Sequence, residues 1–137
     1  MISIVDDDFW VREAIANYLR SRGYPVAAFA SAEEFLQSDD LDRTTCVVLD
    51  IQLPGQSGFD LQRELRARGR TAPVIFVTAV ADEDVRSRAM AAGAAAFLRK
   101  PFEAAAFDRC LDRALRGQID ATLQAAVEAV VTSRNQS

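Results

Sequence analysis

The chain has 137 residues, a formal net charge of −4, and a composition that is 50% hydrophobic and 26% charged. This length fits one domain, and the balance is that of an ordinary soluble globular protein. The net negative charge argues against a nucleic-acid-binding face. No apolar stretch approaches the roughly 20 residues of a membrane span, and there is no secretory signal. A soluble protein that binds neither membrane nor nucleic acid is expected.

Histidine is absent from the sequence. Its absence excludes Ser-His-Asp and Cys-His catalysis, and it also excludes zinc held by histidine. The two cysteines, Cys46 and Cys110, fall at expected core positions without metal-ligand spacing. They are interpreted as reduced core residues of a cytoplasmic protein.

Short apolar runs alternate with amphipathic segments of helical length over residues 1–117. The runs expected to form strands are residues 2–5, 26–29, 45–49, 74–78 and 96–99. The segments expected to form helices are residues 10–22, 31–36, 59–68, 82–92 and 103–116. This alternation predicts a doubly wound α/β domain with a five-stranded parallel sheet in the order 2-1-3-4-5, covered by helices on both faces.

Residues 118–137 follow this domain and carry apolar side chains at helical spacing. The members of this stripe are Ile119, Leu123, Ala126, Val127, Val130 and Val131. An amphipathic helix here is not needed to close a five-stranded domain, so its apolar side requires a cover. The segment is therefore expected to act as a linker, to fold back on the domain, or to form a dimer.

Acidic, hydroxyl and basic residues follow the ends of four expected strands. In a doubly wound sheet, the carboxyl ends of the strands border the ligand crevice. The residues placed there are Asp6, Asp7, Asp50, Thr78 and Lys100. Oxygen ligands without histidine suit Mg²⁺, or Mn²⁺ in its place. A cation, a lysine and a hydroxyl around one carboxylate complement a phosphoryl group on that carboxylate. Asp8 is instead expected to cap the following helix.

Four ordered motifs give the chain a family resemblance. They are IVDDD at residues 4–8, VVLDIQLPGQSGFDL at 47–61, VIFVTA at 74–79 and FLRKPF at 97–102. Over residues 2 to about 116, the sequence resembles the receiver domains of two-component response regulators. The resemblance implies a receiver domain at residues 1–117 with the flavodoxin-like (βα)5 fold.

The resemblance also implies the roles of individual residues. Asp50 would accept the phosphoryl group, and Asp6 and Asp7 would organise Mg²⁺. Asp7, Asp50 and the backbone carbonyl of Gln52 would bind the ion directly, and Asp6 would act partly through water. Thr78 would hydrogen-bond the phosphoryl group.

On the strand over residues 96–99 and after it, Lys100 would pair with the phosphoryl group and Phe97 would occupy the aromatic switch position. An aromatic residue on a strand can equally be plain core, and that reading stays open for Phe97. The Lys100–Pro101 bond is expected to be cis.

The implied function is a phosphorelay switch rather than an enzyme. A sensor histidine kinase or phosphotransfer protein would phosphorylate Asp50. Phosphorylation would change the face formed by residues 82–92, 96–99 and 103–116, which would then bind a partner or a second copy. Whether the chain acts alone or belongs to a longer transcription factor stays open, as does the pathway that it serves.

Two alternatives use the same architecture. An aspartyl-phosphate phosphatase of the dehalogenase-like type would need a second acid two residues after the nucleophile, and that position is Gln52. A flavodoxin-like cofactor binder would need a glycine- and hydroxyl-rich loop after the first strand. This chain has three aspartates there, at residues 6–8.

Overall fold

The computed structural model describes residues 1–80 and 82–117. Five parallel strands form one sheet in the order β2-β1-β3-β4-β5, which confirms the predicted fold. The strands are β1 (Ile2–Val5), β2 (Val26–Phe29), β3 (Cys46–Asp50), β4 (Val74–Thr78) and β5 (Ala96–Arg99). The helix expected within residues 118–137 lies outside the described residues.

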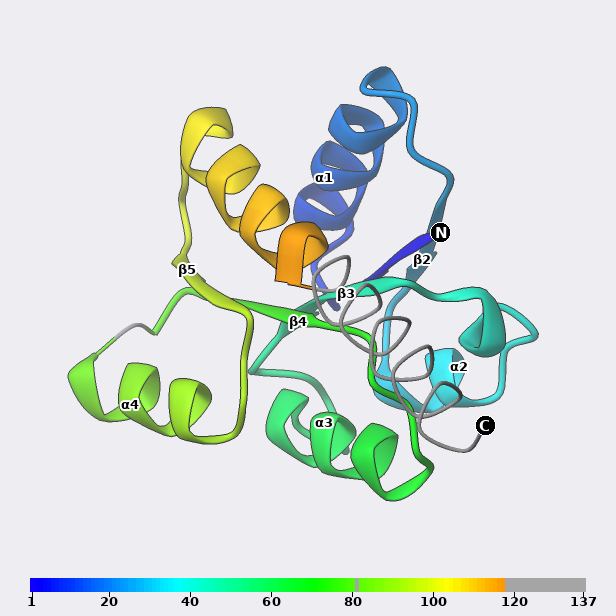
Figure 1. The fold of residues 1–137 in the computed structure, drawn as a ribbon, viewed down its shortest axis with the longest axis vertical. Coiled ribbons are helices and arrows are strands. Elements are labelled where there is room, and N and C mark those ends of the chain that lie inside the picture. Colours follow the sequence, from blue (N-terminus) through cyan, green and yellow to red (C-terminus); the bar gives the residue numbers. More distant parts are fainter. Residues whose placement is uncertain (81, 118–137) are drawn as a thin grey trace, which may run out of the picture.

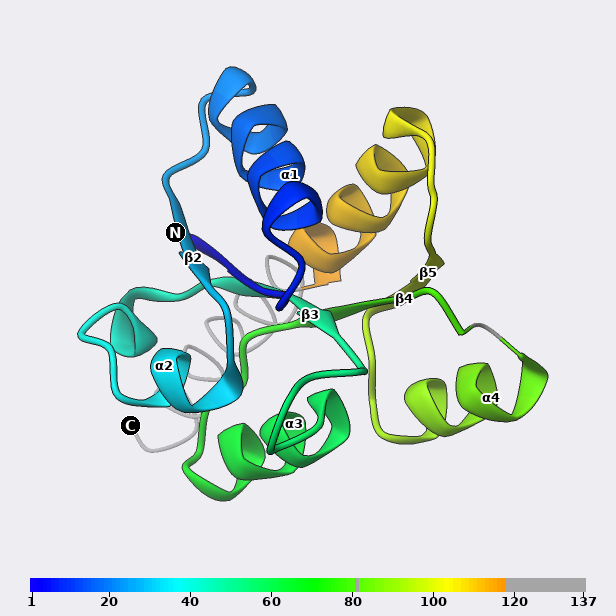
Figure 2. The same cartoon turned by 180° about the vertical axis from the view of Figure 1, so that it is seen from behind.

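Helices cover both faces of the sheet. The helices of the described residues are α1 (Phe9–Ser21), α2 (Ala32–Leu36), α3 (Gly58–Ala67), α4 (Glu83–Ala91) and a helix over residues 104–117, which is the last helix of this described part. A short 3-10 turn, η1 (Leu41–Arg43), precedes β3. Figures 1 and 2 show α1 and the last helix on one face and α2, α3 and α4 on the other. In the part of the chain that the structure describes, no helix is long and apolar enough to span a membrane.

Successive side chains of each central strand enter two different cores. Ile4 of β1 packs in the cluster beneath α1 and the last helix, whereas its neighbour Val5 packs in the cluster beneath α2 and α3. Val48 and Leu49 of β3 divide in the same way. This is the period-2 alternation of a strand buried on both faces. It explains why residues 46–49 of β3 form a continuous apolar run in the sequence.

Side chains cap the starts of α1 and α2. Asp8 caps α1 by accepting from the N–H groups of Trp10 and Val11, which confirms its predicted role. Ser31 accepts from the Glu34 N–H. The spacing of Ser31 and Glu34 predicts a capping box, but the Glu34 carboxylate accepts from the N–H of residue 30 instead of that of Ser31, so the box is not closed.

A complete capping box closes at the start of α3. The Ser57 side chain accepts from the Asp60 N–H, and the Asp60 carboxylate accepts from the Ser57 N–H. Because this box closes around Ser57, α3 begins at Gly58 and not at residue 59 as expected.

Gly58 is also the point of closest approach between α3 and the end of β3. A Cβ atom built on Gly58 would lie 2.4 Å from the Asp50 carbonyl oxygen and 2.8 Å from the Ile51 Cα. Both neighbours are backbone atoms, so no side chain can move aside. The absence of a side chain at residue 58 therefore allows α3 to begin directly against the backbone of Asp50.

We expect Gly58→Ala to lower the free energy of unfolding by about 1–3 kcal/mol, because the added methyl group must displace backbone. Urea unfolding of the purified protein measures this change. Gly117→Ala is the matched control, since a Cβ at Gly117 meets no atom of the described residues within 4 Å. Equal stability of the two variants would contradict the close approach described here.

The two cysteines are expected to differ in reactivity. Burial raises the pKa of the Cys46 thiol to about 12, whereas Cys110 is only partly buried. In native protein at pH 8.5, iodoacetamide should therefore alkylate Cys110 and spare Cys46, and in urea it should alkylate both, as read by peptide mass spectrometry. Equal native labelling of the two thiols would contradict this expectation.

The unfolded Cys46 thiol ionises at about pH 8.5 and the folded one does not. Cys46 should therefore also make the protein less stable as the pH rises above about 8.5.

Candidate functional site

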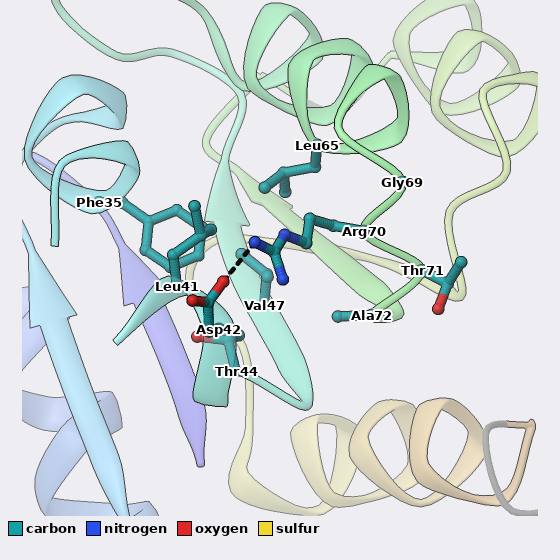
Figure 3. A pocket seen from close by; sticks show the side chains of 10 residues that line it. All are labelled: Phe35, Leu41, Asp42, Thr44, Val47, Leu65, Gly69, Arg70, Thr71 and Ala72. Carbon is teal, nitrogen blue, oxygen red and sulfur yellow. Dashed lines mark ion pairs between the residues drawn. The ribbon is translucent and has the colours of Figure 1, made fainter. Parts of the chain in front are cut away.

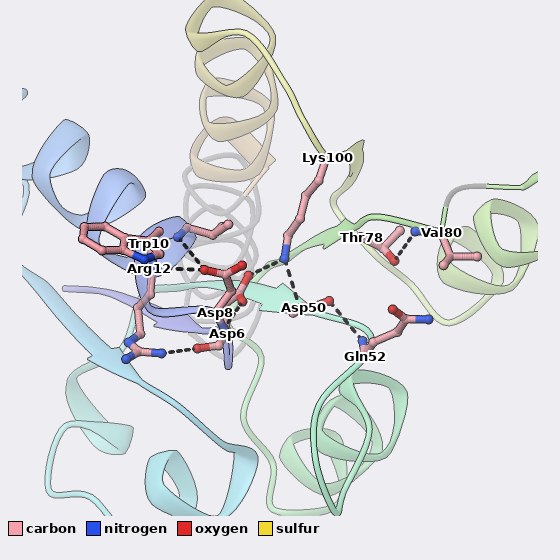
Figure 4. A network of polar contacts seen from close by, with 10 residues as sticks. Asp6, Asp8, Trp10, Arg12, Asp50, Gln52, Thr78, Val80 and Lys100 are labelled. Carbon is pink, nitrogen blue, oxygen red and sulfur yellow. Dashed lines mark hydrogen bonds and ion pairs between the residues drawn. The ribbon is translucent and has the colours of Figure 1, made fainter.

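The carboxyl ends of four strands meet at one edge of the sheet. Leu49 of β3 lies between Val5 of β1 and Phe76 of β4, so these strands end level with one another. The residues predicted for the site are placed at this edge: Asp6 and Asp7 after β1, Asp50 at the end of β3, Thr78 at the end of β4, and Lys100 after β5. Figure 4 shows Lys100 reaching toward Asp6 and Asp50, with Thr78 on the neighbouring strand.

Three carboxylates form a cluster at this edge. One oxygen each from Asp6, Asp7 and Asp50 lies within 4.8 Å of the others. Asp6 and Asp50 are buried, at 2% and 6% exposure, whereas Asp7 is exposed. Negative charges this close repel one another, and burial strengthens the repulsion. The cluster therefore requires a positive charge.

Lys100 supplies that charge in the structure. Its ammonium lies 2.6 Å from Asp6 Oδ2 and 3.2 Å from Asp50 Oδ2, and its side chain is only 14% exposed. The lysine bridges β1 and β3 from its position after β5. The Lys100–Pro101 bond is cis, as predicted.

The pKa values of two groups reflect this arrangement. Burial and the negative charge of Asp6 raise the pKa of Asp50, while the Gln52 N–H and the Lys100 ammonium oppose the rise. Burial acts to lower the pKa of Lys100, but its hydrogen bond to Asp6 and the charge of Asp50 outweigh burial, and the pKa is raised. Lys100 is therefore held as a cation that supplies positive charge rather than a base.

Asp6 has its polar atoms engaged on several sides. Its Oδ1 accepts from the Asp8 N–H at 2.9 Å, and its Oδ2 accepts from Lys100. Its backbone carbonyl accepts from Arg12 Nη1 at 2.6 Å. Sequence reasoning missed Arg12, because an arginine in the first turns of a helix has no pattern that distinguishes it from a solvated one.

The remaining predicted residues lie around Asp50. The Gln52 N–H donates to Asp50 Oδ1 at 3.0 Å, which places the Gln52 backbone beside the carboxylate. Thr78 is fully buried, and its hydroxyl accepts from the Val80 N–H at 3.1 Å. Phe97 is partly buried and packs against the core beneath α2 and α3. Its position satisfies the core reading and leaves a switch role as a prediction.

The donor set fits a small hard cation. Every candidate ligand is an oxygen atom, as Mg²⁺ prefers. Opposite ligands of one Mg²⁺ ion lie about 4.2 Å apart, since each is bound at about 2.1 Å. The three carboxylates, within 4.8 Å of one another, need only a small adjustment to bind one such ion.

One hollow lies beside this edge of the sheet, and another lies away from it. A cavity of about 580 Å³ lies between α1 and residues 100–107, with Lys100 at its border and mainly apolar side chains around it. A second hollow, of about 200 Å³, lies among α2, η1 and the end of α3, where Arg70 pairs with Asp42 (Figure 3). None of the residues predicted for the site lines the second hollow.

Sequence relatives share the greater part of the chain. "Nodulation protein W" of Bradyrhizobium diazoefficiens is 46% identical over 102 residues, which are 74% of this chain and 45% of the relative. "Transcriptional regulatory protein FixJ" of Azorhizobium caulinodans is 44% identical over 106 residues, 77% of this chain and 50% of the relative. The chain thus spans about half the length of these curated relatives.

Solved structures and a family profile agree with these relatives. The structure titled "Low Resolution Structure of Response Regulator StyR" matches with a TM-score of 0.79 and 40% identity, over 96% of this chain and 65% of that one. The structure of FixJ-N matches with a TM-score of 0.73 and 34% identity, over 82% and 90% of the two chains. The profile of the response regulator receiver domain matches residues 2–112. The chain therefore belongs to the receiver-domain family of two-component response regulators.

Proposed function

We propose that this receiver domain is a signalling switch in which Asp50 accepts a phosphoryl group from a sensor histidine kinase or a phosphotransfer protein. The observation that supports this proposal most strongly is the surrounding of Asp50. Its carboxylate is almost buried, it lies beside two other acids, and a single lysine bridges it to one of them. In this setting the Asp50 carboxylate can exchange Lys100 for another cation and can take on the further negative charge of a phosphoryl group.

The nucleophile is an oxygen of the Asp50 carboxylate. The Gln52 N–H holds Oδ1 and the Lys100 ammonium holds Oδ2, so the carboxylate is oriented before a donor arrives. In the transfer, one carboxylate oxygen forms a bond to phosphorus. The phosphorus–nitrogen bond of the donor's phosphohistidine breaks, and its electron pair stays on the imidazole nitrogen. The product is an acyl phosphate on Asp50.

Asp6, Asp7, Asp50 and the backbone carbonyl of Gln52 would hold Mg²⁺, or Mn²⁺ in its place. When bound, the cation would neutralise negative charge on the transferring phosphoryl group. Asp6 and Asp50 carry the Lys100 ammonium in the structure. Lys100 is thereby available to pair with the phosphoryl oxygens once a cation neutralises the acids.

Thr78 and the face beyond it would report phosphorylation. The Thr78 hydroxyl accepts from the Val80 N–H, and its own O–H can donate to a phosphoryl oxygen. Val80 leads toward α4, in which only Ala89 is buried. A helix with so little buried surface is suited to shift, and Phe97 on β5 would adjust with it. The changed face of α4, β5 and the last helix would bind a partner or a second copy.

The proposal extends to the protein's place in the cell. The soluble fold and the reduced cysteines support a cytoplasmic location. The FixJ relative is named a transcriptional regulatory protein, and this name supports an output in the control of transcription. Gln52 stands where a dehalogenase-like phosphatase needs an acid, and the acidic loop after β1 opposes a flavin phosphate. Neither alternative function is favoured by an observation.

Asp50→Asn should abolish phosphorylation, because the amide offers no anionic oxygen nucleophile. Intact-mass spectrometry after incubation with acetyl phosphate and Mg²⁺ measures the added phosphoryl group. Asp39→Asn is the matched control, since Asp39 is exposed and makes the same change of charge. Asp39→Asn should be labelled like wild type, and EDTA should prevent the labelling of wild type and of Asp39→Asn. Normal labelling of Asp50→Asn would show that the acceptor lies elsewhere.

Lys100→Met should destabilise the metal-free protein by about 3 kcal/mol, because it leaves two buried carboxylates without their cation. Mg²⁺ should restore much of this loss and should raise the melting temperature of the variant more than that of wild type. Thermal unfolding with EDTA and with Mg²⁺ measures both effects. Arg99→Met is the control, because Arg99 is exposed and is the last residue of β5, directly before Lys100. If both variants unfold alike in EDTA, Lys100 does not neutralise the cluster.

A further inference from the structure

We propose that Arg12 is a positioning residue for the cation site: its guanidinium holds the Asp6 carbonyl and thereby directs the Asp7 carboxylate toward the cation. The inference rests on the proposed function, which places Mg²⁺ at Asp6, Asp7 and Asp50. It adds a residue that lies outside the acid cluster and acts through the backbone.

The contact between Arg12 and the Asp6 carbonyl is short, and the Arg12 side chain is held by its neighbours. Arg12 Nη1 donates to the Asp6 carbonyl oxygen at 2.6 Å, and Arg12 is partly buried. Arg12 lies one turn into α1, where its own N–H donates to the Asp8 carbonyl. The guanidinium also lies over the Phe9 ring, 5.7 Å from its centroid. Figure 4 shows the side chain extending from α1 back to the end of β1.

The Asp6 carbonyl belongs to the peptide group that joins Asp6 to Asp7. A peptide group is planar, so fixing the direction of its carbonyl fixes the plane that leads into the Asp7 Cα. The next peptide group is held as well, because the Asp8 N–H donates to Asp6 Oδ1. Asp7 thus lies between two restrained peptide groups, and Arg12 holds the first of them.

This restraint matters most for Asp7. Asp6 and Asp50 are buried and paired with Lys100. Asp7 is exposed and lies beyond the last residue of β1, so the strand ladder does not orient it. An exposed carboxylate orders around a cation at an entropic cost unless its backbone is already directed. Arg12 reduces that cost.

The positioning role and the charge of Arg12 have opposite effects on cation binding. A positive guanidinium near the acids repels a cation, so its removal would strengthen binding if charge were its main effect. If positioning is its main effect, its removal weakens binding. The sign of the change therefore distinguishes the two.

The test is titration of Arg12→Met with Mg²⁺ and with Mn²⁺. Trp10 is the only tryptophan of the chain, and its backbone N–H donates to Asp8 beside the acid cluster, so we expect its fluorescence to report Mg²⁺ binding. The electron paramagnetic resonance signal of free Mn²⁺ reports binding independently of Trp10. We expect affinity for both ions to fall about tenfold, as for other residues that orient metal ligands. Arg20→Met removes the same charge from an exposed position of α1 and should bind like wild type.

Equal or tighter binding by Arg12→Met would overturn the inference. Circular dichroism establishes that each variant is folded at the titration temperature, and Arg12→Gln is judged by the same criterion if Arg12→Met does not fold. The outcome is separable from failure of the proposed function. If wild type binds neither ion, the cation site itself is absent; if wild type and Arg20→Met bind and Arg12→Met binds equally well, only the role of Arg12 fails.

Discussion

The Lys100 ammonium between the carboxylates of Asp6 and Asp50 is the interaction on which this edge of the molecule depends. Two buried carboxylates cannot share a poorly solvated edge without a cation. The lysine meets this requirement from β5, so one side chain connects the ends of β1, β3 and β5. The same requirement makes the edge responsive, because any other cation or anion that arrives must change the lysine's partners.

The two acids bridged by Lys100 are each held by a helix start. Asp6 is connected to α1 through the Asp8 N–H and Arg12, whereas the backbone of Asp50 meets α3 at Gly58. The carboxylates are therefore attached to opposite faces of the sheet, since α1 and α3 cover different faces. Contacts that are already formed thus connect the charges at this edge to both helix layers.

Much of this arrangement could be predicted from the sequence, and the reason is the burial of the central strands. The strands β1 and β3 are buried on both faces, so their apolar runs end where polar residues begin, and parallel register brings Asp6, Asp50, Thr78 and Lys100 to one edge. The cap at Asp8 could also be predicted, because helix capping depends on residues that are adjacent in the sequence.

Other features could not be predicted, because they depend on contacts across space. Whether Arg12 meets solvent or the Asp6 carbonyl depends on how α1 crosses the end of β1. The close approach of Gly58 to Asp50 depends on where α3 packs, and a glycine after a serine in a polar stretch indicates a turn equally well. The Glu34 carboxylate bonds residue 30 in place of Ser31, a choice between adjacent N–H groups that no pattern distinguishes.

The backbone hydrogen bond from the Lys100 N–H to the Thr78 carbonyl, at 2.8 Å, has a kinetic consequence. It extends the β4–β5 ladder past its last paired residues, so the two polar residues at these strand ends share one rigid frame. Their response to a new charge is confined to rotation of side chains, which is faster than a collective movement of the backbone. Rearrangement of a whole helix takes microseconds or longer. On the proposed function, the edge would therefore respond to its ligands before α4 completes one movement, so the duration of the signal would depend on chemistry at Asp50 and its onset on α4.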